Sequence, residues 1–122
     1  EPARVAPYLE RAVRDVSYDV RTAALPGLAL AWSQRQDAHE LGRVLVASDT
    51  DSIRRFVALE ALVARAQRQS APAADRAAAR AELDRIADGG PALARLVARI
   101  GKSFIEAPPA EMHAFIERLF GG

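Results

Sequence analysis

Arginine is the residue type in this sequence with the most binding chemistry. Of the 17 basic residues, all but Lys102 are arginines. A guanidinium group binds carboxylates and phosphates through two parallel hydrogen bonds, and it also stacks on aromatic rings. With the single tryptophan included, the residues predicted to contribute to an interaction surface are Arg21, Trp32, Arg54, Arg55, Arg65, Arg68, Arg76 and Arg80.

A series of arginines from Arg65 to Arg85 straddles two predicted helices and could line one groove that grips phosphates or an acidic peptide. Asp75, Glu82 and Asp84 interleave with this series, which favours an ordinary solvated surface. The net charge of +1 provides no field that would steer a polyanion to the protein. Nucleic acid is therefore the less favoured partner, and an Arg-lined module that binds it is kept as an alternative.

Residues that could serve catalysis or hold a metal ion do not form a complete set. His39-Glu40 is followed by Arg43 where a zinc motif requires a second histidine. His113 and Glu117 are one helical turn apart, but two ligands without a third favour a solvated pair. The sequence has no cysteine and no glycine-rich phosphate loop. We expect no cofactor, no metal and no enzymatic activity.

The composition predicts one all-α domain, residues 1–122. Half of the residues are hydrophobic, few are aromatic, and alanine, leucine and arginine dominate, all of which favour helices. Apolar spacing and turn residues predict helices at about 2–16, 18–35, 37–47, 52–69, 74–87, 92–105 and 109–120.

Helices 18–35 and 52–69 each carry two apolar faces, which is typical of a helix between neighbours. Pro26 and Gly27 are expected to kink or break the first of these near residue 25. Trp32 in a two-faced helix belongs more often to a core than to a binding surface, although it stands near the helix end. The first helix is expected to bury a stripe of Val5, Leu9, Ala12, Val13 and Val16. Helix 92–105 is expected to bury Leu93, Leu96, Val97, Ile100 and Phe104.

Similar octets recur every 34 residues. Residues 24–31 read ALPGLALA, residues 58–65 read ALEALVAR and residues 92–99 read ALARLVAR. Around the first two octets the similarity extends to a polar turn and an aliphatic-Arg pair, Val20-Arg21 and Ile53-Arg54. The third octet lacks this lead-in, because IADGGP precedes it. The pattern predicts two repeats and a divergent C-terminal part.

The stretches DVSYDVRTAALPGLALA and SDTDSIRRFVALEALVA resemble the second helix of HEAT-like repeats. The resemblance covers roughly residues 3–70. It implies two stacked antiparallel helical hairpins, a fragment of an α-solenoid, with the divergent residues 71–122 ending in a helical cap. It also implies that Arg21 and Arg54 are equivalent and pair with acids of the turns, Asp19, Asp49 or Asp51.

By analogy with such repeats, we expect a non-catalytic protein-binding module, a scaffold, adaptor or accessory domain whose partner is another protein. A compact helical bundle with a small-molecule or enzymatic pocket is a further alternative. A homo-oligomer is expected if the Ala-rich region leaves apolar surface open. No apolar run approaches the length of a membrane span, so we expect no membrane partner. The expected compartment is the cytoplasm, with a secreted mature form as the alternative.

Overall fold

The computed structural model describes residues 2–68, 70–105, 114, 117 and 118. Within these ranges it contains helices and connections and no strand, which confirms the prediction of an all-α protein. The six helices are α1 (Pro2–Ala12), α2 (Tyr18–Arg35), α3 (Ala38–Val46), α4 (Ser52–Gln67), α5 (Ala73–Gly89) and α6 (Ala92–Ile105). The expected helix at 109–120, together with His113, lies largely outside the described residues.

Polar turn residues begin three of the helices. The Ser17 hydroxyl caps α2, and Asp37 forms a capping box with Glu40 at the start of α3. Asp51 caps α4 by accepting the backbone N–H of Arg54 at 2.8 Å. These side chains satisfy amides that have no partner within the helix. The predicted bounds of α2 agree with the observed ones because the Ser17 cap acts locally, and the predicted bounds of α6 agree as well.

Two local expectations are wrong. The first helix ends at Ala12 rather than near residue 16, and Val16 lies outside it with a side chain 98% exposed. Helix α2 continues through Pro26, so the expected break near residue 25 does not occur. Pro26 lies on the exposed side of α2. Because proline has no backbone N–H, the carbonyl of Thr22 loses its helical hydrogen bond, but on this side it can bind water instead.

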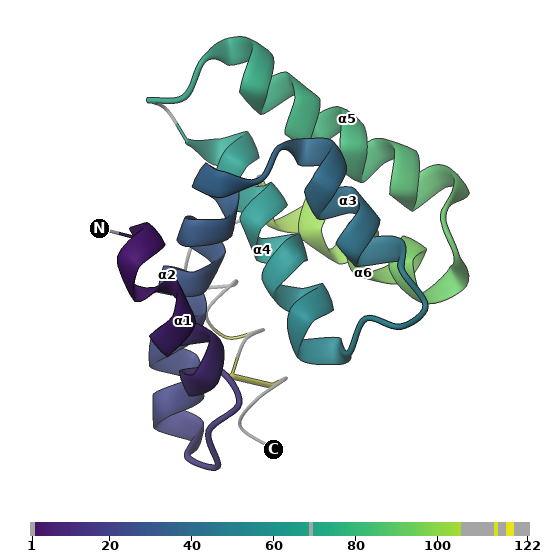
Figure 1. Ribbon diagram of the computed structural model, residues 1–122. Coiled ribbons are helices and arrows are strands. Elements are labelled where there is room, and N and C mark those ends of the chain that lie inside the picture. The colour runs from purple at the N-terminus through teal and green to yellow at the C-terminus, as the bar shows by residue number, and fades with distance from the viewer. Residues whose placement is uncertain (1, 69, 106–113, 115–116, 119–122) are drawn as a thin grey trace.

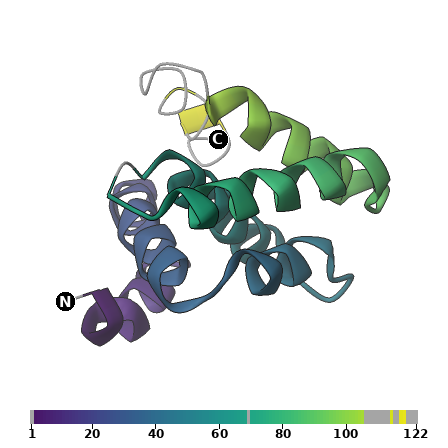
Figure 2. The same cartoon turned by 90° about the horizontal axis from the view of Figure 1, so that it is seen from above.

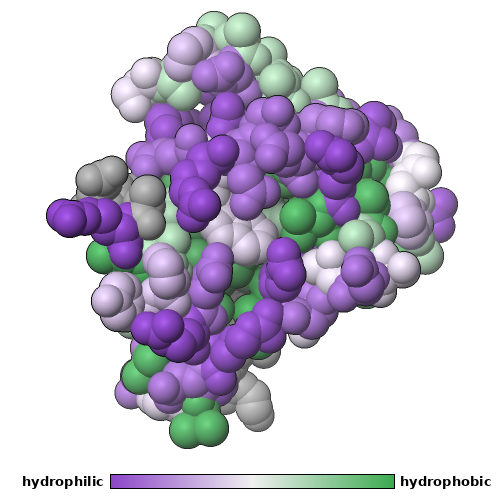
Figure 3. Space-filling view, viewed as in Figure 1, coloured by the Kyte–Doolittle hydropathy of each residue, from purple (hydrophilic) through white to green (hydrophobic). Residues whose placement is uncertain are grey.

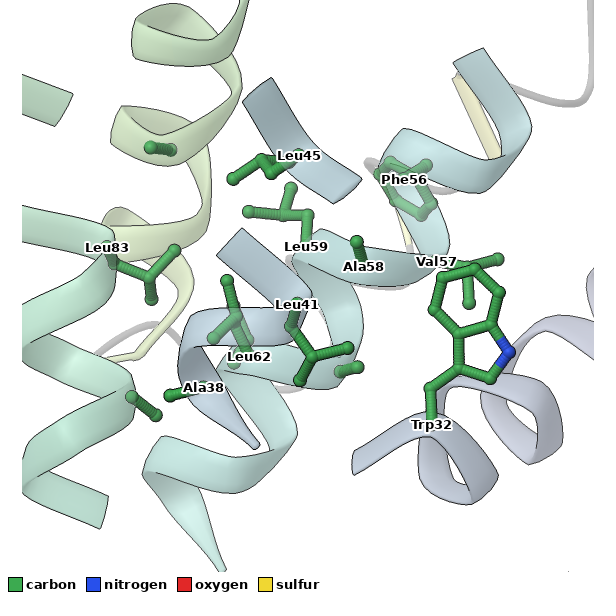
Figure 4. Packing of buried hydrophobic residues seen from close by; sticks show 14 of the residues in the cluster. Trp32, Ala38, Leu41, Leu45, Phe56, Val57, Ala58, Leu59, Leu62 and Leu83 are labelled. Atoms are coloured by element: carbon green, nitrogen blue, oxygen red, sulfur yellow. The ribbon is translucent and has the colours of Figure 1, made fainter. Parts of the chain in front are cut away.

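Helix α4 is the centre of the structure. It packs against α2, α3, α5 and α6, while α1 packs on α2 and α5 packs on α6 (Figures 1 and 2). The close view shows Leu41 and Leu45 of α3 meeting Leu59 and Leu62 of α4 (Figure 4). Leu83 of α5 lies on the same side of α4, and Trp32 of α2 lies beside Val57 on the other. Neighbours on several sides explain why α4 needs apolar residues on two faces.

Helix α6 sits on its neighbours through small residues rather than large ones. Its buried residues are Ala94, Ala98 and Gly101. A Cβ atom at Gly101 would collide with the Leu59 side chain, so α6 approaches α4 closely there. The expectation that Leu93 and Leu96 are buried is wrong, since they are 55% and 56% exposed. Val97, Ile100 and Phe104 are only partly buried. Helix α6 therefore faces α4 with its small residues, and its large apolar residues lie on a more exposed side of the helix.

Candidate interaction surface

Two of the predicted arginines bind loop carbonyls. Arg21 donates to the carbonyls of Asp15 and Val16, at 2.9 and 3.1 Å, in the turn before α2. Arg55 donates to the carbonyl of Leu45 in the last turn of α3, at 3.0 Å, and to the carbonyl of the capping residue Ala47, at 2.9 Å. Each guanidinium therefore closes the loop that leads into its own helix, and the role is structural.

Arg21 and Arg54 differ in their hydrogen bonds: Arg21 binds carbonyl oxygens of its turn, whereas Arg54 makes no side-chain hydrogen bond with the described residues. Arg21 stands four residues after the capping residue Ser17, and Arg55 stands four residues after the capping residue Asp51. Arg55 thus has the same spacing from its capping residue as Arg21, and its hydrogen-bond partners are carbonyl oxygens. Arg54 precedes it by one residue and so lies on a different side of α4.

The remaining predicted arginines do not converge on one groove. Arg65 donates to the carbonyls of Ser33 and Gln36 and so closes the end of α2. Arg85 pairs with Glu82 on its own helix, and Arg80 lines a separate depression with Asp84 and Lys102. Arg68 and Arg76 are partly buried near the two ends of the α4–α5 connection.

Trp32 and Arg54 are the two predicted residues that the fold brings together. They line a hollow of about 290 Å³ with Leu28 of α2 and with Glu10, Val13 and Arg14, which lie on or just after α1. Helix α1 packs chiefly on α2, and the residues just after its C-terminal end face the beginning of α4, where Arg14 contacts Asp51. The side of the molecule seen in Figure 3 is mostly hydrophilic, with apolar side chains showing between the polar ones.

The geometry of this hollow combines an apolar floor with charged walls. Val13, Leu28 and Trp32 belong to the buried core and show only a small part of their surface. The guanidinium carbon of Arg54 lies 5.9 Å from the centroid of the Trp32 ring, within cation–π distance. Arg54 is exposed, and its guanidinium forms no hydrogen bond or ion pair with any described residue.

The other two charged residues of the hollow differ from each other. Arg14 donates to Asp51 Oδ2 at 2.7 Å, so its charge is largely compensated. The pKa of Asp51 is lowered by the backbone N–H of Arg54 and further by Arg14. Glu10 is exposed, and its carboxylate pairs with none of the described residues. The charge of Arg54 also lowers the pKa of Asp51, so Arg54 feels this carboxylate without forming a hydrogen bond to it. Glu10 lines the hollow without an ion-pair partner among the described residues.

Sequence reasoning did not find Glu10, Arg14 or the apolar floor of this site. Arg14 and Asp51 are 37 residues apart, and no periodic pattern links them. The capping role of the SDTDS turn was the one available signal, because it predicts that an acidic residue stands at the start of α4.

A buried carboxylate lies elsewhere on α4. Glu60 is partly exposed as a residue, but its Oε2 atom is buried with no hydrogen-bond partner. Burial raises the pKa of Glu60 to about 7. Glu82, at the α3–α5 contact, is buried against Gly42 and compensated by Arg85, with His39 Nδ1 at 4.0 Å.

Within the described part of the chain, no three His, Asp or Glu side chains are grouped so that they could hold a metal ion. None of the described helices is both long enough and apolar enough to cross a membrane. Comparison of the chain with family models, curated proteins and solved structures finds no significant match.

Proposed function

We propose that the protein is a HEAT-like stack of helical hairpins that acts as a non-catalytic protein-binding module within a larger assembly. The packing of the helices supports this fold. Consecutive helices pack in pairs, α1 on α2, α3 on α4 and α5 on α6. The second helices of adjacent pairs also pack together, α2 on α4 and α4 on α6, as do the first helices α3 and α5. Contacts between nearest neighbours of this kind are what a hairpin stack requires.

The hollow around Trp32 and Arg54 carries the functional part of the proposal. Tryptophan and arginine are the residue types most enriched among those that dominate binding energy at protein interfaces. Here the guanidinium carbon of Arg54 lies 5.9 Å from the centroid of the Trp32 ring. Arg54 is exposed and makes no side-chain hydrogen bond with the described residues, while Trp32 is 6% exposed. The chemistry on offer is apolar contact plus one charge-assisted hydrogen-bonding group, which suits recognition of a protein.

The proposal is tested by finding what the full chain retains from a lysate of its source cell, at low and at high salt and after nuclease treatment. Three forms are compared: the natural chain, Arg54→Glu, and Arg43→Gln as the matched control. Arg43 is also an exposed arginine in a helix, outside the hollow. We expect a protein that survives nuclease and high salt, is retained equally by the control and is lost with Arg54→Glu.

Two results would contradict the proposal. Retention that nuclease abolishes would identify nucleic acid as the partner, because phosphate contacts also weaken steeply with salt. Retention that is unchanged by Arg54→Glu would show that the hollow is not where the partner binds. The circular dichroism spectrum of each variant at 222 nm checks that the helices are intact.

A further inference from the structure

Building on the proposed function, we propose that the hollow binds a peptide segment of the partner in which a large apolar side chain stands next to a carboxylate. The apolar side chain would lie against the small exposed parts of Val13, Leu28 and Trp32, which are 3%, 2% and 6% exposed, and the carboxylate would pair with Arg54. This inference names the chemistry of the partner, whereas the proposed function states only that the partner is a protein.

The position of Arg54 is the first argument. Its guanidinium lies over the indole of Trp32, and this contact limits its orientations before any partner arrives. The N–H groups that point away from the ring meet no acceptor among the described residues. A guanidinium in this state offers the two parallel donors that match a carboxylate. Ordering the Arg54 side chain on binding costs less conformational entropy because the contact with Trp32 already restricts it.

The size of the hollow is the second argument. About 290 Å³ lies at or just below the lower end of the range for small-molecule sites, which is roughly 300–1,000 Å³. An α-helix with its side chains is about 10–12 Å across and would not enter such a space. One leucine- or phenylalanine-sized side chain would. The hollow therefore suits a side-chain anchor from a segment that lies across it.

The charges around the hollow are the third argument, and they separate a peptide from a polyanion. Arg14 donates to Asp51, and Arg54 lies near the same carboxylate but makes no side-chain hydrogen bond with the described residues, so its N–H groups remain to meet an incoming anion. Glu10 lines the same hollow and would repel a second negative charge. A nucleic-acid backbone brings several phosphates together, whereas a peptide can place one carboxylate at Arg54 and keep Glu10 free or paired with a cation.

Trp32 makes the inference directly measurable. It is the only tryptophan of the sequence, so fluorescence excited at the red edge of the absorption band, where Tyr8 and Tyr18 absorb little, comes from Trp32. The probes are three pools of capped octapeptides with random flanks free of tryptophan, tyrosine and charged residues. Their fixed central pairs are Leu-Glu, Leu-Gln and Leu-Lys. Each pool is titrated into the natural chain, Arg54→Gln and the control Arg43→Gln.

We expect the Leu-Glu pool to shift the Trp32 emission at concentrations about tenfold lower than the Leu-Gln pool, and the Leu-Lys pool to bind most weakly. That ratio is what one charge-assisted interaction is typically worth. Arg54→Gln removes the preference for Leu-Glu, and Arg43→Gln keeps it. Equal effects of the three pools, a preference that survives in Arg54→Gln, or no response to any pool would each overturn the inference.

Failure here and failure of the proposed function are distinguishable. If a protein is retained in an Arg54-dependent way but the pools show no preference for a carboxylate, the binding module stands and the named chemistry is wrong. If only nucleic acid is retained, the binding module itself is wrong.

Discussion

Exchanging small for large residues on α6 tests the finding that this helix is seated through its small side chains. Ala98 is fully buried between α6 and its neighbours, whereas Leu96 is 56% exposed on the same helix. We predict that Ala98→Leu destabilises the protein and that Leu96→Ala has little effect. A helix seated through its large apolar stripe would give the opposite ranking.

The magnitudes follow from burial. Forcing a larger side chain into a filled contact typically costs about 1–3 kcal/mol, and the close approach of α6 to α4 leaves little room for relaxation. Burying a leucine completely contributes about 1.5–3 kcal/mol. Leu96 is only about half buried, so its burial contributes about half of this free energy. Alanine has a slightly higher helix propensity, so Leu96→Ala should lower the free energy of unfolding by about 1 kcal/mol or less.

Urea unfolding followed by circular dichroism at 222 nm measures both changes in the free energy of unfolding. A difference of 1 kcal/mol corresponds to a shift of roughly 3–5 °C in Tm for a chain of this size, so thermal unfolding provides a second measurement. A loss of about 2 kcal/mol or more for Leu96→Ala, the value typical of a core leucine, would refute the observed seating. If Leu96→Ala lost this much stability while Ala98→Leu kept the stability of the natural chain, the large apolar residues of α6 would lie in the core.

Three further substitutions test the remaining contacts. Arg55→Ala leaves the carbonyls of Leu45 and Ala47, at the end of α3, without this donor. It is expected to lower the free energy of unfolding by about 1–3 kcal/mol, while Arg43→Ala changes it little. Equal losses in urea unfolding would contradict the structural role of Arg55. Asp51→Ala removes the cap of α4 and an ion pair, at a cost of about 1–2 kcal/mol, and Asp51→Asn is expected to cost less because asparagine still caps; thermal unfolding ranks the two. Glu60 binds its proton more tightly when folded, so stability is expected to fall as pH rises from about 4.5 to about 7. Glu60→Gln should flatten this fall, with a gain of up to about 3 kcal/mol above pH 7, and an equally steep fall in the variant would refute the assignment.

Much of the local structure could be predicted from the sequence because its causes are local. The polar turn SDTDS places Asp51 at the start of α4, and the apolar spacing of α2 and α4 predicts helices buried on two sides. Pro26 was misleading because its effect depends on which side of the helix it occupies. On the exposed side, water compensates for the missing hydrogen bond.

Only part of the candidate site was predictable. Trp32 and Arg54 were chosen for their chemistry, but their contact joins residues on α2 and α4 that no sequence pattern relates. Glu10 and Arg14 enter the hollow only because α1 packs chiefly on α2. Arg65 has the same guanidinium chemistry as Arg54, but its donors already bind the carbonyls at the end of α2.

The octets ALEALVAR and ALARLVAR separate what the sequence by itself determined from what the tertiary structure decided. Both form helix, as their composition requires. In the first octet Leu59 and Leu62 are 2% and 0% exposed, whereas Leu93 and Leu96 at the same positions of the second are more than half exposed. The physical reason is the number of neighbours. Helix α4 is packed on by four other helices, while α6 packs mainly on α4 and α5 and is seated by alanine and glycine, so leucines on its free side stay in contact with water.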